Sequence, residues 1–287
     1  MITDKERLLE KYADNLSSSA NRNHYLSYAK DFLEHTDELD RASIDRYVAR
    51  LRKKGWKPGT VNFAFRVIRR LFAVNNLPWE YRRSEAPIIG QRDEYRPQLS
   101  LRIIETIITA AESGRLATDE SAFMALSTTY GLRREEMVNL EHTDINIASN
   151  SIYIATVKYG RERYHLIPPE IRLYLERHAF SQKYGLATLS QMFGRILEKS
   201  GMRELRKLKL GWHTVRRALL DGLIKNGVNV LDARLFLRWK SAVGDMAMPA
   251  RYYGNVVIDL NGSSPVLEEA KGDAEIFLKH PFLHLWA

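Results

Sequence analysis

Apolar residues in the first 76 positions recur every three or four residues, which is the spacing of amphipathic helices. This pattern predicts four helices, over residues 3–16, 20–34, 40–53 and 58–75. On the last of them the apolar side chains share one side, and three basic residues occupy the other: Arg66, Arg69 and Arg70. We therefore expect residues 1–76 to form a helical bundle with basic faces.

The periodicity stops over residues 77–98, where three prolines and mixed charges replace it. Such a stretch is typical of an interdomain linker. Two adjacent arginines near its start, Arg82 and Arg83, are candidates for contacts with phosphate groups.

A second domain is predicted over residues 99–254, and it is helical except for one stretch. From residue 144 the apolar period changes from about four to two, which predicts three short strands up to residue 167, with Lys158 at a hairpin turn. Helical patterns return afterwards, including one from His213 to Asn226 and one over residues 230–239. The predicted fold is mainly α with one small antiparallel β-sheet.

Length and charge restrict the class of protein. A chain of 287 residues can bury two cores, and a net charge of +9 favours a polyanionic partner such as DNA. Without cysteine the chain has no disulfide, thiolate zinc site or cysteine nucleophile. The charged first 16 residues resemble neither a signal peptide nor an anchor, and no apolar run reaches membrane length. We expect a cytoplasmic protein without a membrane partner.

The candidate chemistry lies in a few polar residues of the second domain. His213 and Arg216 are three residues apart at the start of a helix, so they share a face. Arg133 follows a glycine that interrupts a helical pattern, and Tyr252 lies in a basic, aromatic cluster. An imidazole moves protons near neutral pH, a guanidinium binds two phosphate oxygens, and a phenol can act as a nucleophile. Together these groups favour phosphoryl transfer.

Each of these residues also has an ordinary structural explanation. Arg133 could start a solvated helix, and Lys158 could be a common hairpin lysine. His213 could be a helix-terminal histidine, Trp239 a core aromatic, and Tyr252 a packing residue beside Tyr253. Only their joint occurrence, in this order, argues for catalysis.

In that order the residues resemble the tyrosine recombinase family, the phage-type integrases and Xer-like recombinases. The family's Gly-x-Arg-x-x-Glu-x-x-x-Leu box is matched by Gly131, Arg133, Glu136 and Leu140. Its hairpin lysine, His-x-x-Arg box, later His or Trp, and nucleophile are matched by Lys158, His213 with Arg216, Trp239, and Tyr252 or Tyr253. By motif the similarity covers residues 99–254, and residues 1–76 fit the family's helical core-binding domain by size and position.

The resemblance implies a site-specific recombinase that cleaves and rejoins DNA through a 3′-phosphotyrosyl intermediate. Arg133 and Arg216 would hold the phosphate, and Glu136 would orient Arg133. Lys158 would be the general acid, His213 a base or hydrogen-bond donor, and Trp239 a donor to a phosphate oxygen. Such a reaction implies no metal and no cofactor.

The nucleophile departs from the usual spacing. In the family it lies nine residues after the His or Trp position, but the ninth residue after Trp239 is Met248. Either residues 241–247 contain an insertion, or the match at Trp239 is partly fortuitous. The family's common Arg-Tyr pattern favours Tyr252 over Tyr253.

Two other functions fit the same residues: DNA relaxation of the type IB topoisomerase kind, and DNA binding by a non-catalytic protein on this fold. The complete set of boxes argues against the second, and the helical N-terminal domain with a C-terminal extension argues against the first. That extension, residues 255–287, is called the tail below. It ends in large apolar side chains, so it either folds back onto its own domain or, as we expect, contacts a neighbouring protomer of a tetramer assembled on two DNA sites.

Overall fold

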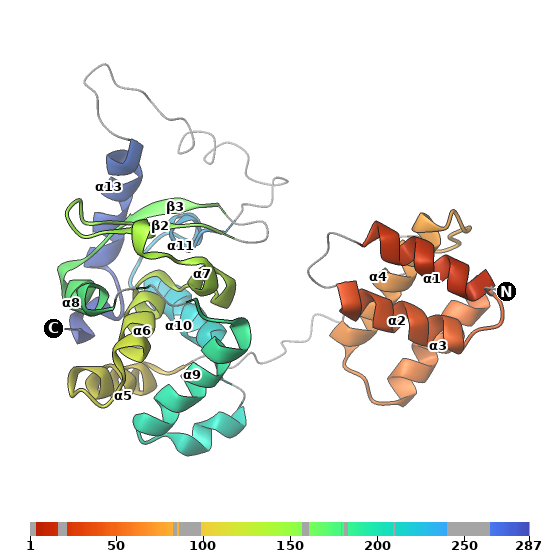
Figure 1. The fold of residues 1–287 in the computed structure, drawn as a ribbon, viewed down its shortest axis with the longest axis horizontal. Coiled ribbons are helices and arrows are strands. Elements are labelled where there is room, and N and C mark those ends of the chain that lie inside the picture. Colours follow the sequence, from red (N-terminus) through yellow and green to blue (C-terminus); the bar gives the residue numbers. More distant parts are fainter. Residues whose placement is uncertain are drawn as a thin grey trace. The chain divides into compact units, whose positions relative to one another are not determined.

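The chain folds into two compact units, Met1–Tyr95 and Arg96–Ala287 (Figure 1). The computed structural model describes residues 4–16, 22–82, 85, 99–156, 161–178, 180, 183–208, 210–239 and 265–286, with only the backbone for 265–271. Among these residues no helix combines the length and the apolar character needed to cross a membrane.

Four helices form the N-terminal unit: α1 (Asp4–Asn15), α2 (Arg22–Glu34), α3 (Arg41–Lys53) and α4 (Pro58–Val74). Local signals set their ends. The Asp40 carboxylate accepts a hydrogen bond from the Ser43 amide at 2.8 Å, and Pro58 occupies the first turn of α4, where its missing N–H costs nothing. Tyr12, Phe32 and Phe72 lie in the shared core, which confirms the predicted helical bundle.

The first residues of the predicted linker pack on this bundle. The Trp79 ring lies 5.3 Å from that of Phe65, and the Tyr81 ring lies 5.1 Å from it. The Tyr81 hydroxyl donates to the Asp45 carboxylate at 2.9 Å. Two large aromatic side chains gain more from packing on α4 and the start of α3 than from exposure, so the chain follows the N-terminal unit beyond residue 77.

One helix lies at the centre of the C-terminal unit. Every residue of α6 (Thr118–Tyr130) from Glu120 onward is buried, because neighbouring helices of the unit pack around it on several sides. The helices of this unit before the tail are α5 (Leu101–Glu112), α6, α7 (Arg134–Asn139), α8 (Pro169–Arg177), α9 (Leu186–Lys199), α10 (Trp212–Lys225) and α11 (Val230–Phe236). A 3₁₀ helix, Arg203–Leu208, precedes α10.

A three-stranded antiparallel sheet lies above α5, α6 and α9 in Figure 1, in the order β1 (Ile145–Asn146), β2 (Ser151–Ile154) and β3 (Arg163–Leu166). Ile152 pairs with His165, and both side chains are fully buried. On the outer face Tyr153 pairs with Tyr164. The predicted mainly α fold with a small antiparallel sheet is thus confirmed, although the strands are shorter than the sequence pattern suggested.

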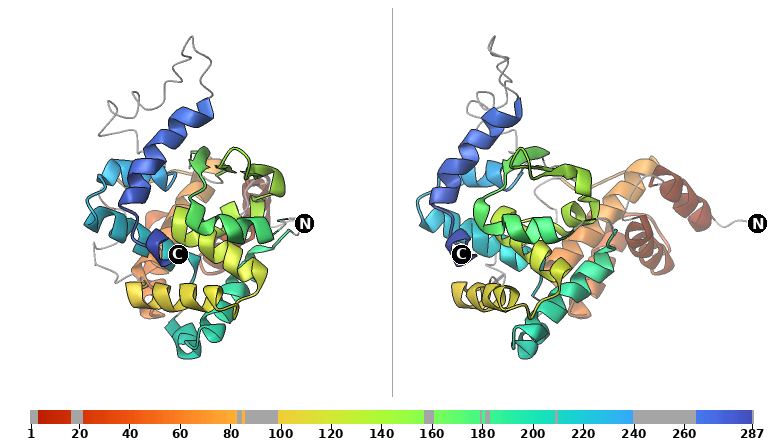
Figure 2. Two further views of the ribbon diagram at one scale, coloured as in Figure 1. Left: turned by 90° about the vertical axis from the view of Figure 1, so that its left-hand side faces the viewer. Right: turned by 60° about the vertical axis from the view of Figure 1, so that its left-hand side comes forward.

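The tail helix α13 (Pro265–Leu278) runs beside β3 of its own chain (Figures 1 and 2). Beyond it, the Trp286 indole donates to the Thr128 hydroxyl at 3.0 Å, and His280 Nε2 lies 3.0 Å from the Thr129 carbonyl. Phe282, two residues after His280, is buried as well. In this single chain the described part of the tail therefore packs on its own unit, and exchange between protomers stays a prediction.

Candidate active site

The turn between α6 and α7 presents Arg133. α6 ends at Tyr130 and is capped by Gly131, whose φ of 59° suits glycine. A Cβ at Gly131 would lie 2.7 Å from Leu237 Cδ2 and 3.2 Å from Arg216 Cγ. Arg133 then caps α7 in extended conformation, and the Glu136 carboxylate accepts from its amide at 2.9 Å. The glycine and the glutamate that the motif requires therefore shape the turn that carries the arginine.

Arg216 reaches the same turn from α10. The N-terminus of this helix is fixed by Trp212, which is buried and donates its indole N–H to the Leu189 carbonyl at 2.8 Å. Arg216 lies one turn later with only 4% of its surface exposed, and it donates to the carbonyls of Gly131, at 2.5 Å, and Leu237. Two backbone carbonyls thus fix the orientation of this guanidinium.

His213 lies three residues before Arg216 on α10, and its side chain is exposed. Partial loss of hydration lowers the pKa of His213, and the positive charges of Arg134 and Arg216 lower it further. The imidazole is therefore neutral near pH 7, the form that can accept a proton.

Trp239 follows α11, which ends at Phe236 and not at residue 239 as the sequence predicted. The half-buried indole ring lies 5.5 Å from the Arg216 guanidinium carbon and 5.6 Å from that of Arg234. Both distances fall within the range of cation–π contacts. The ring therefore covers the guanidinium of Arg216.

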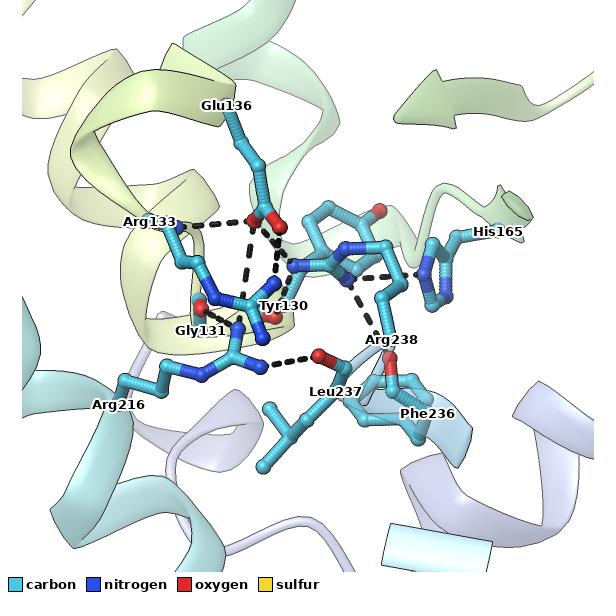
Figure 3. A network of polar contacts seen from close by, with 9 residues as sticks. All are labelled: Tyr130, Gly131, Arg133, Glu136, His165, Arg216, Phe236, Leu237 and Arg238. Atoms are coloured by element: carbon cyan, nitrogen blue, oxygen red, sulfur yellow. Dashed lines mark hydrogen bonds and ion pairs between the residues drawn. The ribbon is translucent and has the colours of Figure 1, made fainter. Parts of the chain in front are cut away.

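Glu136 lies between three arginines, as Figure 3 shows. Its carboxylate is 2.5 Å from Arg133 Nη1, 2.9 Å from Arg238 Nη2 and 4.0 Å from Arg216 Nη1. Burial acts to raise the pKa of Glu136, but the charge and hydrogen bond of Arg238 and the amide of Arg133 outweigh burial and lower the pKa below its usual value. An ionised Glu136 holds Arg133 and Arg216, called the arginine pair below, side by side.

Arg238 contacts Glu136 and was not indicated by the sequence, nor were His165 and Asp273, to which it is connected. Its side chain is fully buried and also contacts His165 on β3, which in turn contacts Asp273 on α13. These residues are far apart in the chain, and no local pattern distinguishes them. The only available signal was a charged residue directly before Trp239, inside an apolar stretch.

Several residues predicted for the site lie outside the described part of the chain: Lys158, Tyr252 and Tyr253. Of the five candidate DNA-binding arginines, Arg83 also lies outside it, and Arg66, Arg69 and Arg82 are exposed. Arg70 is exposed as well, but it donates to the Asn15 side chain at 3.0 Å and lies 5.8 Å from the Tyr25 ring. Where the structure describes the chain, no three acidic or histidine side chains are grouped so that they could hold a metal ion.

Comparisons with known proteins identify the family of the chain. Residues 98–252, more than half of the chain, match the model of the phage integrase family. Tyrosine recombinase XerA of Thermococcus kodakarensis is 24% identical over 228 residues, which cover 72% of this chain and 76% of that protein.

Solved structures show the same fold. The Tn1549 transposon integrase in complex with transposon right end DNA has a TM-score of 0.61 at 13% identity, covering 80% of this chain and 90% of that one. A lambda integrase tetramer bound to a Holliday junction has a TM-score of 0.59 at 15% identity, covering 86% and 76%. With its family match, its fold and its arginine pair, the chain belongs to the phage integrase family and is a DNA recombinase of the tyrosine type.

Proposed function

We propose that this recombinase cleaves one DNA strand at a phosphate held by the arginine pair and forms a 3′-phosphotyrosyl bond to Tyr252. The observation that carries the proposal is the convergence of two guanidinium groups, 83 residues apart in sequence, around one buried carboxylate. A phosphodiester resists attack because its charge repels nucleophiles, and guanidinium groups stabilise the charge that develops on the nonbridging oxygens. With Glu136 holding them in place, the pair needs little reorganisation during the reaction.

The remaining roles follow from the chemistry of the step. The Tyr252 oxygen attacks phosphorus while the bond to the 5′-oxygen breaks, and Lys158 gives that oxygen a proton. His213, neutral near pH 7, takes the tyrosine proton or donates to the phosphate. Trp239 covers Arg216 and supplies an indole N–H to a phosphate oxygen. The reaction reverses when the 5′-hydroxyl of a second strand attacks the phosphotyrosyl bond, and it needs no metal or cofactor.

Double-stranded DNA is the proposed partner. The net charge of +9 and the exposed Arg66, Arg69 and Arg82 support phosphate contacts by the N-terminal unit, with Arg83 and Arg70 as further candidates. Because a related integrase forms a tetramer on a Holliday junction, we expect this chain to assemble likewise on two DNA sites, with the tail as a contact between protomers.

The test begins with selection of DNA sequences that the full chain binds from a random library. The selected site is then made as a suicide substrate, a duplex with a nick just beyond the cleavage point, so that the released fragment diffuses away and the covalent complex accumulates. Denaturing electrophoresis detects the complex, and peptide mass mapping identifies the residue that carries the DNA.

Two variants decide the nucleophile. One phenol oxygen attacks the phosphorus, so one of the two tyrosines carries the DNA. Tyr252→Phe should bind DNA and form no adduct, whereas Tyr253→Phe should still form one. The reverse result transfers the role to Tyr253. No adduct from the parent chain, adducts from both variants, or loss of cleavage in excess chelator would contradict the proposal.

A further inference from the structure

Arg238 is held in a costly position that the reaction proposed above does not use. Its guanidinium is fully buried, and its backbone has a φ of 57°, the left-handed region that residues other than glycine rarely adopt. Burial of a charge is unfavourable unless partners compensate it, and the left-handed conformation adds strain. Surrounding contacts must therefore hold Arg238 in place.

Those contacts lead to the arginine pair. Arg238 Nη2 donates to Glu136 Oε2 at 2.9 Å and to the Tyr130 carbonyl at 3.1 Å. The Glu136 carboxylate also accepts hydrogen bonds from the side chain and from the backbone amide of Arg133. Arg238 therefore binds the one group that fixes Arg133 and faces Arg216, so a displaced Arg238 would displace Glu136 as well (Figure 3).

On its other side Arg238 is connected to the C-terminal helix. Arg238 Nη1 lies 3.0 Å from His165 Nε2 and can only donate, so Nε2 accepts and His165 Nδ1 carries the proton. Nδ1 donates to Asp273 Oδ2 at 2.9 Å. Asp273, buried on α13, also accepts from Arg163 at 2.8 Å and from the Leu166 amide at 3.1 Å. Hydrogen bonds thus connect α13, through β3 and Arg238, to α7.

The charges of this network leave the site positive. Four arginines, Arg133, Arg163, Arg216 and Arg238, surround two carboxylates, Glu136 and Asp273, so two positive charges exceed the negative ones. A phosphodiester bound between Arg133 and Arg216 would be attracted by this excess of positive charge. Asp273 acts on Arg238 through His165: its carboxylate holds the proton on Nδ1, so that Nε2 stays an acceptor for Arg238. Without Asp273, Arg238 would be held less firmly beside Glu136.

We propose that Arg238 is a positioning residue for the arginine pair, and that Asp273 on the C-terminal helix holds it in place through His165. The phosphate site is then complete only when α13 is docked on β3. This inference rests on the proposed role of Arg133 and Arg216 in holding a phosphate, but it makes no use of the nucleophile.

The first measurement uses inorganic phosphate as the probe, in calorimetric titrations of the full chain. Loss of the signal in Arg133→Ala assigns the binding to the arginine pair. Arg238→Lys keeps the charge but shortens the reach, and Asp273→Asn keeps the shape but removes the charge. Each should weaken phosphate binding by on the order of tenfold, because the pair is displaced by a fraction of an ångström.

Trp286→Phe is the matched control. It removes one tail contact, the bond to Thr128, which lies outside the network. This variant should bind phosphate like the parent, and urea unfolding of every variant shows whether it is folded. The inference is overturned if Trp286→Phe weakens phosphate binding as much as the network variants do. It is also overturned if the parent chain binds no phosphate, because the arginine pair would then not be preformed.

The second measurement separates positioning from a merely structural role. The selected DNA site is prepared with an ordinary phosphate or with an uncharged methylphosphonate at the cleavage point. If Arg238 acts by placing positive charge, Arg238→Lys should cleave the ordinary substrate on the order of 10²-fold more slowly than the parent, and the deficit should shrink on the uncharged one. An equal deficit on both substrates contradicts the inference. If the parent forms no adduct at all, the proposed nucleophile fails, and the phosphate titration still decides the role of Arg238.

Discussion

The two units place their charged groups in opposite ways. Among the described residues of the N-terminal unit, the buried polar side chains are neutral, Thr36 and Ser43, and the arginines of α4 face outward. The C-terminal unit buries several ionisable groups: Glu120, Glu136, His165, Arg216, Arg238, Asp273 and His280. A buried charge is costly and contributes little stability over an apolar replacement, so the contrast supports the chemistry proposed for the C-terminal unit and the phosphate contacts proposed for the N-terminal one.

Removal of the central carboxylate is expected to have the largest effect. Glu136→Ala leaves Arg238 buried without its anion, so the free energy of unfolding should fall by about 3–5 kcal/mol. Glu34→Ala, which breaks the exposed pair with Lys30, is the control in the N-terminal unit and should cost less than about 1 kcal/mol. Urea unfolding measures both, and similar losses would remove the distinction between the units.

Removal of one arginine of the pair should lower the rate of DNA cleavage more than it lowers the free energy of unfolding. Arg133 keeps about a fifth of its side chain exposed, so Arg133→Ala should fold, bind the selected DNA and cleave it at least about 10²-fold more slowly. Arg69→Ala in the N-terminal unit removes the same charge and should cleave bound DNA at the parental rate. Single-turnover adduct formation at saturating protein measures the step, and parental cleavage by Arg133→Ala would refute its role.

Acid should loosen the tail before it unfolds the N-terminal unit. His280 Nδ1 accepts from the amides of Phe282 and Leu283, and burial lowers the pKa of His280 to about 3. Since an unfolded histidine has a pKa of about 6.5, the stability that His280 contributes is fully present above that pH and is lost as the pH falls towards 3. Fluorescence of the buried Trp286 during urea unfolding at pH 7 and pH 5 should report this loss.

The control is His280→Asn, whose amide does not titrate. This variant should be less stable at pH 7 but should lose less stability between pH 7 and pH 5 than the parent. An unchanged pH dependence would show that His280 is not the group responsible, and would direct attention to His165, whose pKa burial lowers to about 4.

The smallest effect is expected at the surface of the N-terminal unit. Arg66→Ala and Arg69→Ala should change the free energy of unfolding by less than about 0.5 kcal/mol, yet each should lower the slope of log affinity against log salt by about 1. Arg70→Ala is the comparison, because Arg70 also donates a hydrogen bond to the Asn15 side chain and its loss should lower the free energy of unfolding as well. If none of the three substitutions alters the slope of log affinity against log salt, this face of α4 does not contact DNA.

The N-terminal unit was predictable because its signals are local. Asp40 and Pro58 mark helix starts, and the apolar period gives the core. In the C-terminal unit the box around Gly131 was visible for the same reason. Arg238, His165 and Asp273 could not be predicted in this way. The hydrogen bonds from Arg238 to His165 and from His165 to Asp273 join residues at least 73 positions apart, so no local sequence pattern reveals them. The predicted helix over residues 230–239 was too long, because Arg238 leaves the helical conformation to make these contacts and α11 ends at Phe236.

The docking of the tail also limits how far the proposed nucleophile can travel. Tyr252 lies thirteen residues after Trp239 and thirteen before Pro265, and the structure fixes both of those ends on one unit. Thirteen residues span at most about 45 Å when fully extended, so the phenol stays within about that distance of both anchors. Such confinement corresponds to an effective concentration in the millimolar range, against which a tyrosine from a separate molecule at cellular concentration competes poorly. While the tail is docked on its own chain, we therefore expect the proposed nucleophile to favour the strand that its own subunit holds.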